Sequence, residues 1–166
     1  MPTTEPSTLV SEKLPNDLRQ WLGERCLVSL ALEAVQAVNG RVLHGSDRGS
    51  DSKLRMMLTL LCYCYSAGIL GSQHIEWAIQ SDLMLRYICA GESPDWLTIR
   101  RFRRQHVELL CQGLAYLLKR VRALKTGAAA PSVVGWSESE LDHEIAGAVR
   151  SRIDTAIVLD TATSDF

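Results

Sequence analysis

Four arginines lie within five consecutive residues, at Arg100, Arg101, Arg103 and Arg104. The planar guanidinium group donates paired hydrogen bonds to phosphate oxygens or to the O6 and N7 atoms of guanine. Residues 96–126 hold 8 lysines and arginines and one acidic residue, so they carry a net charge of +7, whereas the whole chain carries −1. Such local concentration of positive charge is typical of an element that contacts phosphates.

The alternative is a solvated helix face whose arginines pair with acidic neighbours. Two observations favour phosphate contact. Glu108 is the only acidic residue in the basic segment, and the arginines fall in the first turns of a predicted helix, where the macrodipole disfavours cations. A second basic group lies near the end of that helix, where the dipole favours cations, so we expect it to contact the DNA backbone only secondarily. Its members are Lys119, Arg120, Arg122 and Lys125.

Short amphipathic helices must position these arginines. Apolar periodicity and capping residues predict helices over 16–38, 52–67, 74–80, 83–90, 97–125 and 137–158. Ser72, Asp82 and Asp95 are the predicted N-caps of the third, fourth and fifth. No segment reads as a strand, so the predicted fold class is all-α, a multi-helix bundle. The helices from residue 74 onward predict a helix-turn-helix-like tri-helical unit, in which two helices brace a third that reads the major groove.

The composition along the chain predicts five regions. These are a disordered leader (1–13), a helical domain (14–125), a linker (126–136), a C-terminal amphipathic helix (137–158) and a frayed tail (159–166). The C-terminal helix has an apolar stripe at Leu141, Ile145, Val149 and Ile153. The stripe has two interpretations: the helix folds back on its own domain, or it forms a homodimer through residues 141–153.

Several function classes lack support in the sequence. No run of 18 apolar residues suggests a membrane span, and the N-terminus does not read as a signal peptide, so we expect a cytoplasmic bacterial protein, nucleoid-associated if it binds DNA. The five cysteines and four histidines have no metal-ligand spacing. We therefore expect buried, reduced thiols, no metal, no cofactor and no small-molecule substrate.

Three ordered segments carry a family resemblance. Residues 54–65 form a long apolar stretch, residues 72–78 read Ser-Gln-His-Ile-Glu-Trp-Ala, and residues 94–106 fit the pattern P-D-x-x-T-I-x-R-F-R-x-x-H. Together they resemble the N-terminal helical domain of DDE-type bacterial insertion-sequence transposases, over about residues 14–120. The resemblance implies that this region binds the terminal DNA of the element and helps to assemble the transposase.

The chain also departs from that family. Cys64 stands where a glycine is usual, and Ser50, Asp51 and Ser52 replace a proline at the start of the long apolar helix. Family members continue into a ribonuclease-H-like domain with three metal-binding carboxylates, whereas this chain ends at Phe166. Its last acidic residues lie on or beside one helix and do not suit a two-metal site. We therefore expect no enzymatic activity.

The sequence thus predicts a non-catalytic domain that binds duplex DNA, such as element ends, from a truncated or stand-alone transposase. The expected contacts are Arg100, Arg101, Arg103, Arg104, Thr98, Lys119 and Arg120. The alternative is a helical protein–protein interaction module that binds an acidic partner or a transposase subunit. In a variant of this alternative, the acidic segment 137–166 docks on the basic helix of its own chain and lowers DNA affinity.

Overall fold

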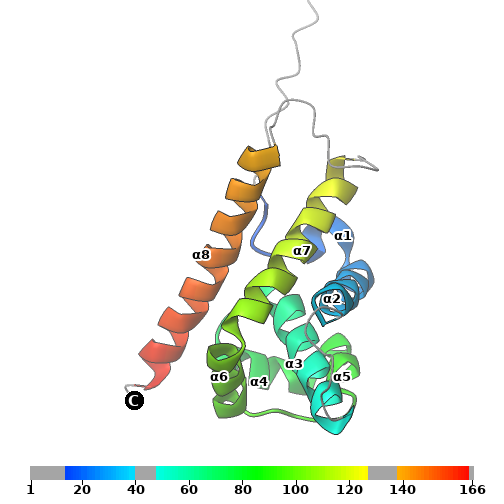
Figure 1. Ribbon diagram of the computed structural model, residues 1–166. Coiled ribbons are helices and arrows are strands. Elements are labelled where there is room, and N and C mark those ends of the chain that lie inside the picture. Colours follow the sequence, from blue (N-terminus) through cyan, green and yellow to red (C-terminus); the bar gives the residue numbers. More distant parts are fainter. Residues whose placement is uncertain (1–13, 40–47, 127–137, 165–166) are drawn as a thin grey trace, which may run out of the picture.

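The computed structural model describes residues 14–39, 48–126 and 138–164 (Figure 1). These residues form eight helices and no strand, which confirms the all-α class. The helices are α1 (Arg19–Leu22), α2 (Glu24–Asn39), α3 (Arg48–Ser66), α4 (Ser72–Ser81), α5 (Leu83–Cys89), α6 (Trp96–Gln105), α7 (Val107–Thr126) and α8 (Glu138–Ser164). The predicted leader and nearly all of the predicted linker lie outside the described residues.

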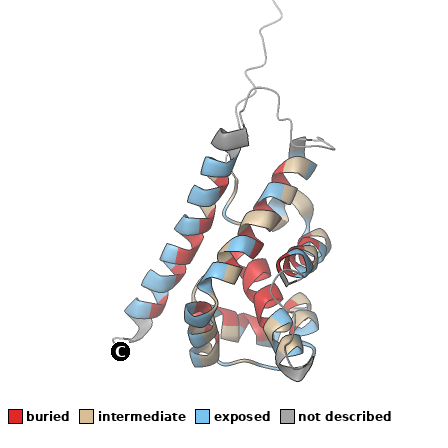
Figure 2. Cartoon of the chain, in the orientation of Figure 1, coloured by how far each residue is buried: buried red, intermediate tan, exposed pale blue. Residues whose placement is uncertain are grey.

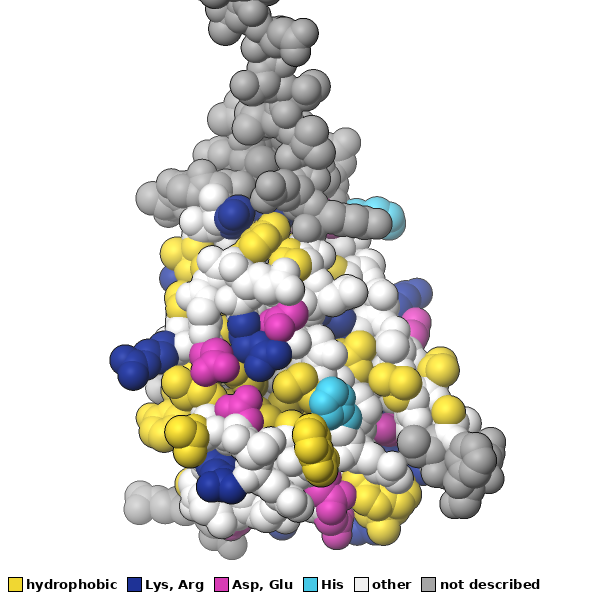
Figure 3. Space-filling view, turned by 180° about the vertical axis from the view of Figure 1, so that it is seen from behind, with side chains coloured by type: hydrophobic (Ala, Val, Ile, Leu, Met, Phe, Trp, Pro, Cys, Tyr) yellow, Lys and Arg dark blue, Asp and Glu magenta, His cyan; other side chains and the backbone are white. Residues whose placement is uncertain are grey.

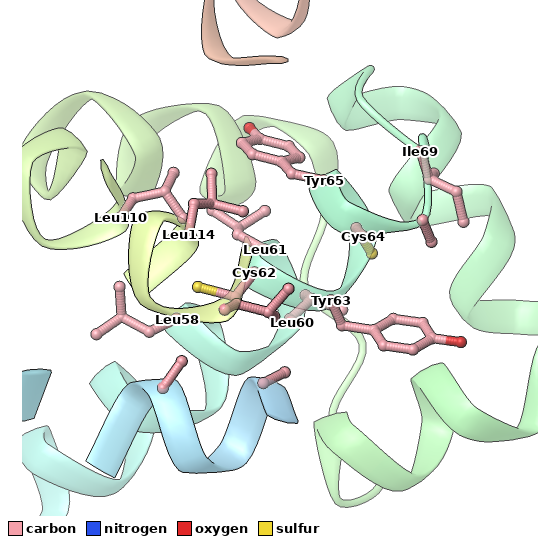
Figure 4. Close-up of a cluster of buried hydrophobic side chains, with 14 of the residues drawn as sticks. Leu58, Leu60, Leu61, Cys62, Tyr63, Cys64, Tyr65, Ile69, Leu110 and Leu114 are labelled. Carbon is pink, nitrogen blue, oxygen red and sulfur yellow. The ribbon is translucent and has the colours of Figure 1, made fainter. Parts of the chain in front are cut away.

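Helix α3 forms the centre of the core. Every residue from Met57 to Ala67 is buried, as expected for a helix that is apolar on all sides. Leu110 and Leu114 of α7 lie against one side of α3 (Figure 4). The two helices approach closely where they cross, because a Cβ atom added to Gly113 would lie 3.0 Å from Sγ of Cys62.

Helix α8 lies beside α7 and runs in the opposite direction (Figure 1). Its buried residues Ile145, Val149, Ile153 and Ala156 line the side that faces α7, while the far side is exposed (Figure 2). Ile145, Val149 and Ile153 of the apolar stripe are therefore buried within the chain itself, as in the fold-back interpretation. The helix also continues to Ser164, so the segment predicted to fray from residue 159 is helical up to that point.

A buried arginine fastens the middle of α8 to two other segments. Nε of Arg152 donates to the backbone oxygen of Tyr65 over 3.0 Å, and its NH2 group donates to the backbone oxygen of Pro15 over 2.9 Å. Burial lowers the pKa of Arg152. Because both acceptors are fixed carbonyls, the side chain holds α8 against the end of α3 and the start of the described chain.

The predicted helix over 97–125 is wrong in one respect, because it is broken at His106. This residue has φ −124° and ψ 28° and separates α6 from α7. The hydrogen bonds continue across the break: His106 N donates to Phe102 O (2.9 Å), and Leu110 N donates to His106 O (3.0 Å). The Phe102 and His106 rings also lie 4.5 Å apart between centroids. The junction is therefore a kink that changes the direction of the chain.

Two of the predicted N-caps are present. The Asp82 carboxylate accepts from Met84 N at 2.8 Å and Leu85 N at 3.4 Å, and the Asp95 carboxylate accepts from Thr98 N at 2.7 Å. Ser72 is not the N-cap of α4, because that position belongs to Gly71, which offers no side-chain acceptor. The start of α4 therefore needs an acceptor from elsewhere in the chain.

Gly68 ends α3 where the chain passes the N-terminal segment. Its φ is +78°, and an added Cβ would lie 3.0 Å from the backbone oxygen of Asn16. We predict that Gly68→Ala lowers the free energy of unfolding by about 2–3 kcal/mol, from both the left-handed backbone and the close contact. Gly91→Ala is the control, since Gly91 has φ +85° and nothing within 4 Å of an added Cβ. Urea unfolding that shows equal losses for both variants would contradict the contact with Asn16.

Candidate nucleic-acid interface

Helix α6 carries the arginine cluster and is fixed at its start by two carboxylates. Asp95 caps the helix through Thr98 N, and this hydrogen bond lowers the pKa of Asp95. The backbone nitrogen of Trp96 donates to Oε2 of Glu76 in α4 over 2.8 Å. Both groups accept from N–H groups that a helix start leaves unpaired. Helix α6 therefore begins at the predicted place and is joined there to α4.

The four arginines of the cluster lie in different environments. Ile99 and Arg103 are the two buried residues of α6, one turn apart on the same face. Arg101 and Arg104 are exposed, and Arg100 is half-buried. The sequence placed Arg103 at the edge of the apolar face, but its side chain keeps only 3% of its surface exposed. Arg103 therefore cannot reach a duplex in this structure, which corrects its expected role as a DNA contact.

The buried guanidinium of Arg103 pairs with the carboxylate of Asp160 in α8. The same carboxylate accepts from Ser72, the first residue of α4: Oδ1 from the backbone nitrogen at 2.8 Å, and Oδ2 from the hydroxyl at 2.7 Å. Burial lowers the pKa of Arg103, but the hydrogen bond to Asp160 contributes to a net rise. Asp160, Ser72 and Arg103 thus form a buried polar junction of three helices, called here the Asp160 junction.

The break at His106 changes the electrostatic argument for the cluster. Because α6 ends at Gln105, Arg103 and Arg104 lie in its last turn. The macrodipole stabilises cations there, whereas the predicted long helix has them in its first turns, where cations are disfavoured. The location of these two arginines along the helix therefore does not require an external anion.

Three members of the second basic group, Lys119, Arg120 and Arg122, are paired with carboxylates of other helices. Nζ of Lys119 lies 2.7 Å from Oδ1 of Asp142 in α8, and Nε of Arg120 lies 3.1 Å from Oε1 of Glu33 in α2. The Lys119 and Asp142 side chains are each about half exposed. Exposed pairs of this kind contribute only about 0–1 kcal/mol, so an external phosphate can compete for Lys119.

Arg101 and Arg104 remain the outward-facing cations of α6. They are three residues apart, so they are neighbours on the helix surface. No acidic residue occurs within α6 itself. Thr98, another expected contact, is half-buried, and its backbone N–H is held by the Asp95 cap. The structure therefore reduces the cluster to a small basic surface centred on Arg101 and Arg104.

Asp160 and Ser72 were missed as partners of Arg103. Asp160 falls in segment 159–166, for which the sequence predicts a frayed tail. A signal was nevertheless present, because the buried stripe at Ile153 and Ala156 continues at helical spacing to residue 160. A charged residue on the apolar face of a helix indicates a buried partner.

The described residues offer little for other chemistry. Among them, no three His, Cys, Asp or Glu side chains come together where they could hold a metal ion. Burial raises the pKa of Cys62 to about 12 and that of Cys89 to about 11, so both thiols stay protonated and weakly nucleophilic. No described helix contains a stretch long and apolar enough to cross a bilayer.

A shallow groove of about 850 Å³ lies between the α1–α2 turn and the α4–α5 turn. Glu24, Asp82 and Arg25 line it together with apolar residues, and none of its lining residues belongs to α6. The groove is therefore separate from the basic surface, and its mixture of charges does not indicate an anion site.

Because Arg103 is buried and paired, we predict that its substitution destabilises the protein much more than substitution of the adjacent Arg104. Arg103→Met removes the cation that compensates the buried Asp160 charge, so we expect the free energy of unfolding to fall by about 2–4 kcal/mol. Arg104→Gln changes an exposed residue and should alter it by less than about 0.5 kcal/mol. Urea titration followed by circular dichroism measures both. Similar losses for the two variants would contradict the burial of Arg103.

Comparison with protein families finds a match in the middle of the chain. Residues 32–105 match the family model described as Transposase domain (DUF772). None of the curated proteins and none of the solved structures matches the chain. The matched segment includes α3 to α6 and ends at Gln105, the last residue of α6. Ser72 and Arg103 lie within it and Asp160 lies outside it, so the Asp160 junction joins the matched segment to α8. Residues 32–105 of this chain are therefore similar to a transposase domain.

Proposed function

We propose that this chain binds duplex DNA through the outer face of α6, as part of a transposase-like protein. The observation that carries the proposal is the exposure of Arg101 and Arg104 on a helix that has no acidic residue of its own. The transposase-related domain supports the proposal, because α6 is the last helix of the matched segment. Element ends are the natural duplex for such a protein.

The geometry of α6 suits a recognition helix. It is 10 residues long, or about 15 Å, and a helix of this width fits the major groove of B-form DNA. Helix α4 packs on its inner side, as in the proposed tri-helical unit, while α5 packs mainly on α2, α3 and α4. Arg101 and Arg104 then reach phosphates or guanine edges, with Arg100 and Thr98 at the flanks.

The second basic group takes a secondary part in this proposal. Lys119 leaves its exposed pair with Asp142 to meet a phosphate. Arg120 is held more firmly, because its partner Glu33 also accepts from the Tyr116 hydroxyl over 2.8 Å. We therefore rank Lys119 above Arg120 as a backbone contact.

The proposed role is binding and not catalysis. Three carboxylates of α8 are engaged by cations of the same chain: Asp142 by Lys119, Glu144 by Arg122 and Asp160 by Arg103. Carboxylates that compensate lysine or arginine charges are poor candidates for holding catalytic metal ions. A DNA-binding role also implies a cytoplasmic, nucleoid-associated location.

The back of the molecule, relative to the view of Figure 1, is a poorer candidate for DNA binding. Figure 3, which shows the molecule from behind, has lysine and arginine side chains interspersed with acidic and hydrophobic ones. Mixed charges of this kind give no extended positive field for a polyanion. This arrangement supports α6 as the place where DNA binds.

Removing the two exposed arginines tests the proposal. We predict that Arg101→Gln combined with Arg104→Gln weakens binding to a duplex and reduces the slope of log affinity against log salt by about 2, one for each lost phosphate contact. Fluorescence anisotropy with labelled duplexes over a salt series measures both quantities. Stability should stay within about 1 kcal/mol of the wild type, because both residues are exposed.

The control removes the same charge elsewhere. Arg25→Gln combined with Lys53→Gln takes two exposed cations from α2 and α3, so it matches the change in net charge. We expect this variant to keep the wild-type salt slope. An equal loss of affinity in both double variants would show general polyanion attraction in place of a site on α6.

A protein-binding function is the second candidate, and one observation favours it. Trp77 in α4 and Tyr87 in α5 are 66% and 69% exposed, and Leu83 is 77% exposed. Large exposed apolar side chains are frequent anchors of protein interfaces. In this alternative, α4 and α5 contact a transposase subunit. It gains weight if Trp77→Ala with Tyr87→Ala abolishes transposase assembly while the α6 double variant leaves DNA affinity unchanged.

A further inference from the structure

Helices α4 and α6 are joined at two points along their contact. At the start of α6, Trp96 N donates to Oε2 of Glu76. Near its end, Arg103 meets Asp160, which also binds Ser72 at the start of α4. Trp96 and Arg103 are seven residues apart, about 10 Å along a helix. Two attachments at this separation fix both the direction and the rotation of α6 on α4.

The second attachment comes from outside the two helices. Gly71 is the N-cap of α4 and has no side-chain acceptor. The Oδ1 atom of Asp160, 88 residues further along the chain, accepts from Ser72 N instead. A carboxylate at this position also interacts favourably with the positive end of the α4 macrodipole. One residue of α8 therefore caps α4 and neutralises Arg103 of α6 at the same time.

We propose that Asp160 is a positioning residue for DNA binding by α6. The proposal rests on the proposed function, because it assigns to Asp160 the orientation of the helix that carries Arg101 and Arg104. These arginines lie on either side of Arg103 in the sequence. A rotation of α6 that releases Arg103 from the Asp160 junction therefore also turns its neighbours away from their outward positions.

The burial of α8 favours a role in positioning α6 over a role in inhibiting DNA binding. An inhibitory α8 must leave the domain easily, yet Ile145, Val149, Ile153 and Ala156 are buried against it. Arg152 is buried as well and donates to the backbone oxygens of Tyr65 and Pro15. Detachment exposes this apolar surface and separates a buried ion pair, both of which are unfavourable. We therefore infer that α8 stays in place when α6 meets DNA.

Replacing Asp160 tests the proposal in the full chain. Asp160→Ala should weaken binding to a labelled duplex several-fold and raise amide hydrogen exchange in the first turn of α4 and throughout α6. The control is Asp154→Ala, which removes the same charge from an exposed position of the same helix. Asp154→Ala should keep wild-type exchange and bind the duplex at least as tightly as the wild type.

A second variant without the buried charges distinguishes a loss of helix position from a loss of stability. It also replaces Asp160→Ala as the test if that variant does not fold. Arg103→Met combined with Asp160→Leu replaces the buried pair with apolar side chains, an exchange that often preserves stability. The urea midpoint should recover relative to Asp160→Ala. Affinity for the duplex should stay several-fold below wild type, because the apolar pair does not fix the rotation of α6. Recovery of full affinity would overturn the positioning role.

The remaining outcomes are also decisive. If Asp160→Ala binds DNA more tightly than Asp154→Ala, α8 is an inhibitory segment and the positioning proposal is wrong. If exchange in α6 is unchanged by Asp160→Ala, the proposal fails whether or not the protein binds DNA. If the wild type binds no duplex at any salt concentration, the proposed function fails, and the exchange data alone then decide whether Asp160 orients α6.

Discussion

The buried ion pair between Arg103 and Asp160 is the interaction on which the arrangement of this protein depends. A charge in the protein interior is stable only when it is paired and hydrogen-bonded. Asp160 meets this condition by accepting from Ser72 as well as pairing with Arg103. Because the pair joins α6 to α8, the segment 32–105 that is similar to a transposase domain has a buried arginine whose compensating charge lies at residue 160. We therefore regard α8 as an integral part of the folded unit.

The same pairing limits the basic surface. Residues 96–126 contain eight lysines and arginines, and four of these, Arg103, Lys119, Arg120 and Arg122, have carboxylate partners on α2 or α8. The acidic residues that surround the basic segment in the sequence thus neutralise part of it in space. Arg101 and Arg104 are exposed on α6, and they carry the proposed contact with DNA. Charge segregation along the chain therefore overstates the positive charge available to a ligand.

The fold was largely predictable from the sequence because local signals specify its helices. The N-caps Asp82 and Asp95 and the apolar periodicity of α3 all depend on neighbouring residues. No proline or glycine marks the kink at His106, and the part of α8 beyond residue 158 is held by the tertiary contacts of Asp160 with Ser72 and Arg103. The exposed arginines were harder to predict, because burial of an arginine also depends on tertiary contacts. Arg103 lies on the buried face of α6 with Ile99, but its partner Asp160 lies 57 residues further along the chain.

Arginine labelling tests the central claim most directly. A dicarbonyl reagent modifies accessible guanidinium groups, and peptide mass spectrometry then gives the labelling rate of each arginine with and without duplex DNA. The account predicts that Arg101 and Arg104 react rapidly in the free protein and are protected by the duplex, while Arg103 stays unlabelled in both states. Labelling of Arg103 at the rate of Arg101, or labelling of Arg101 and Arg104 that DNA does not slow, would contradict it.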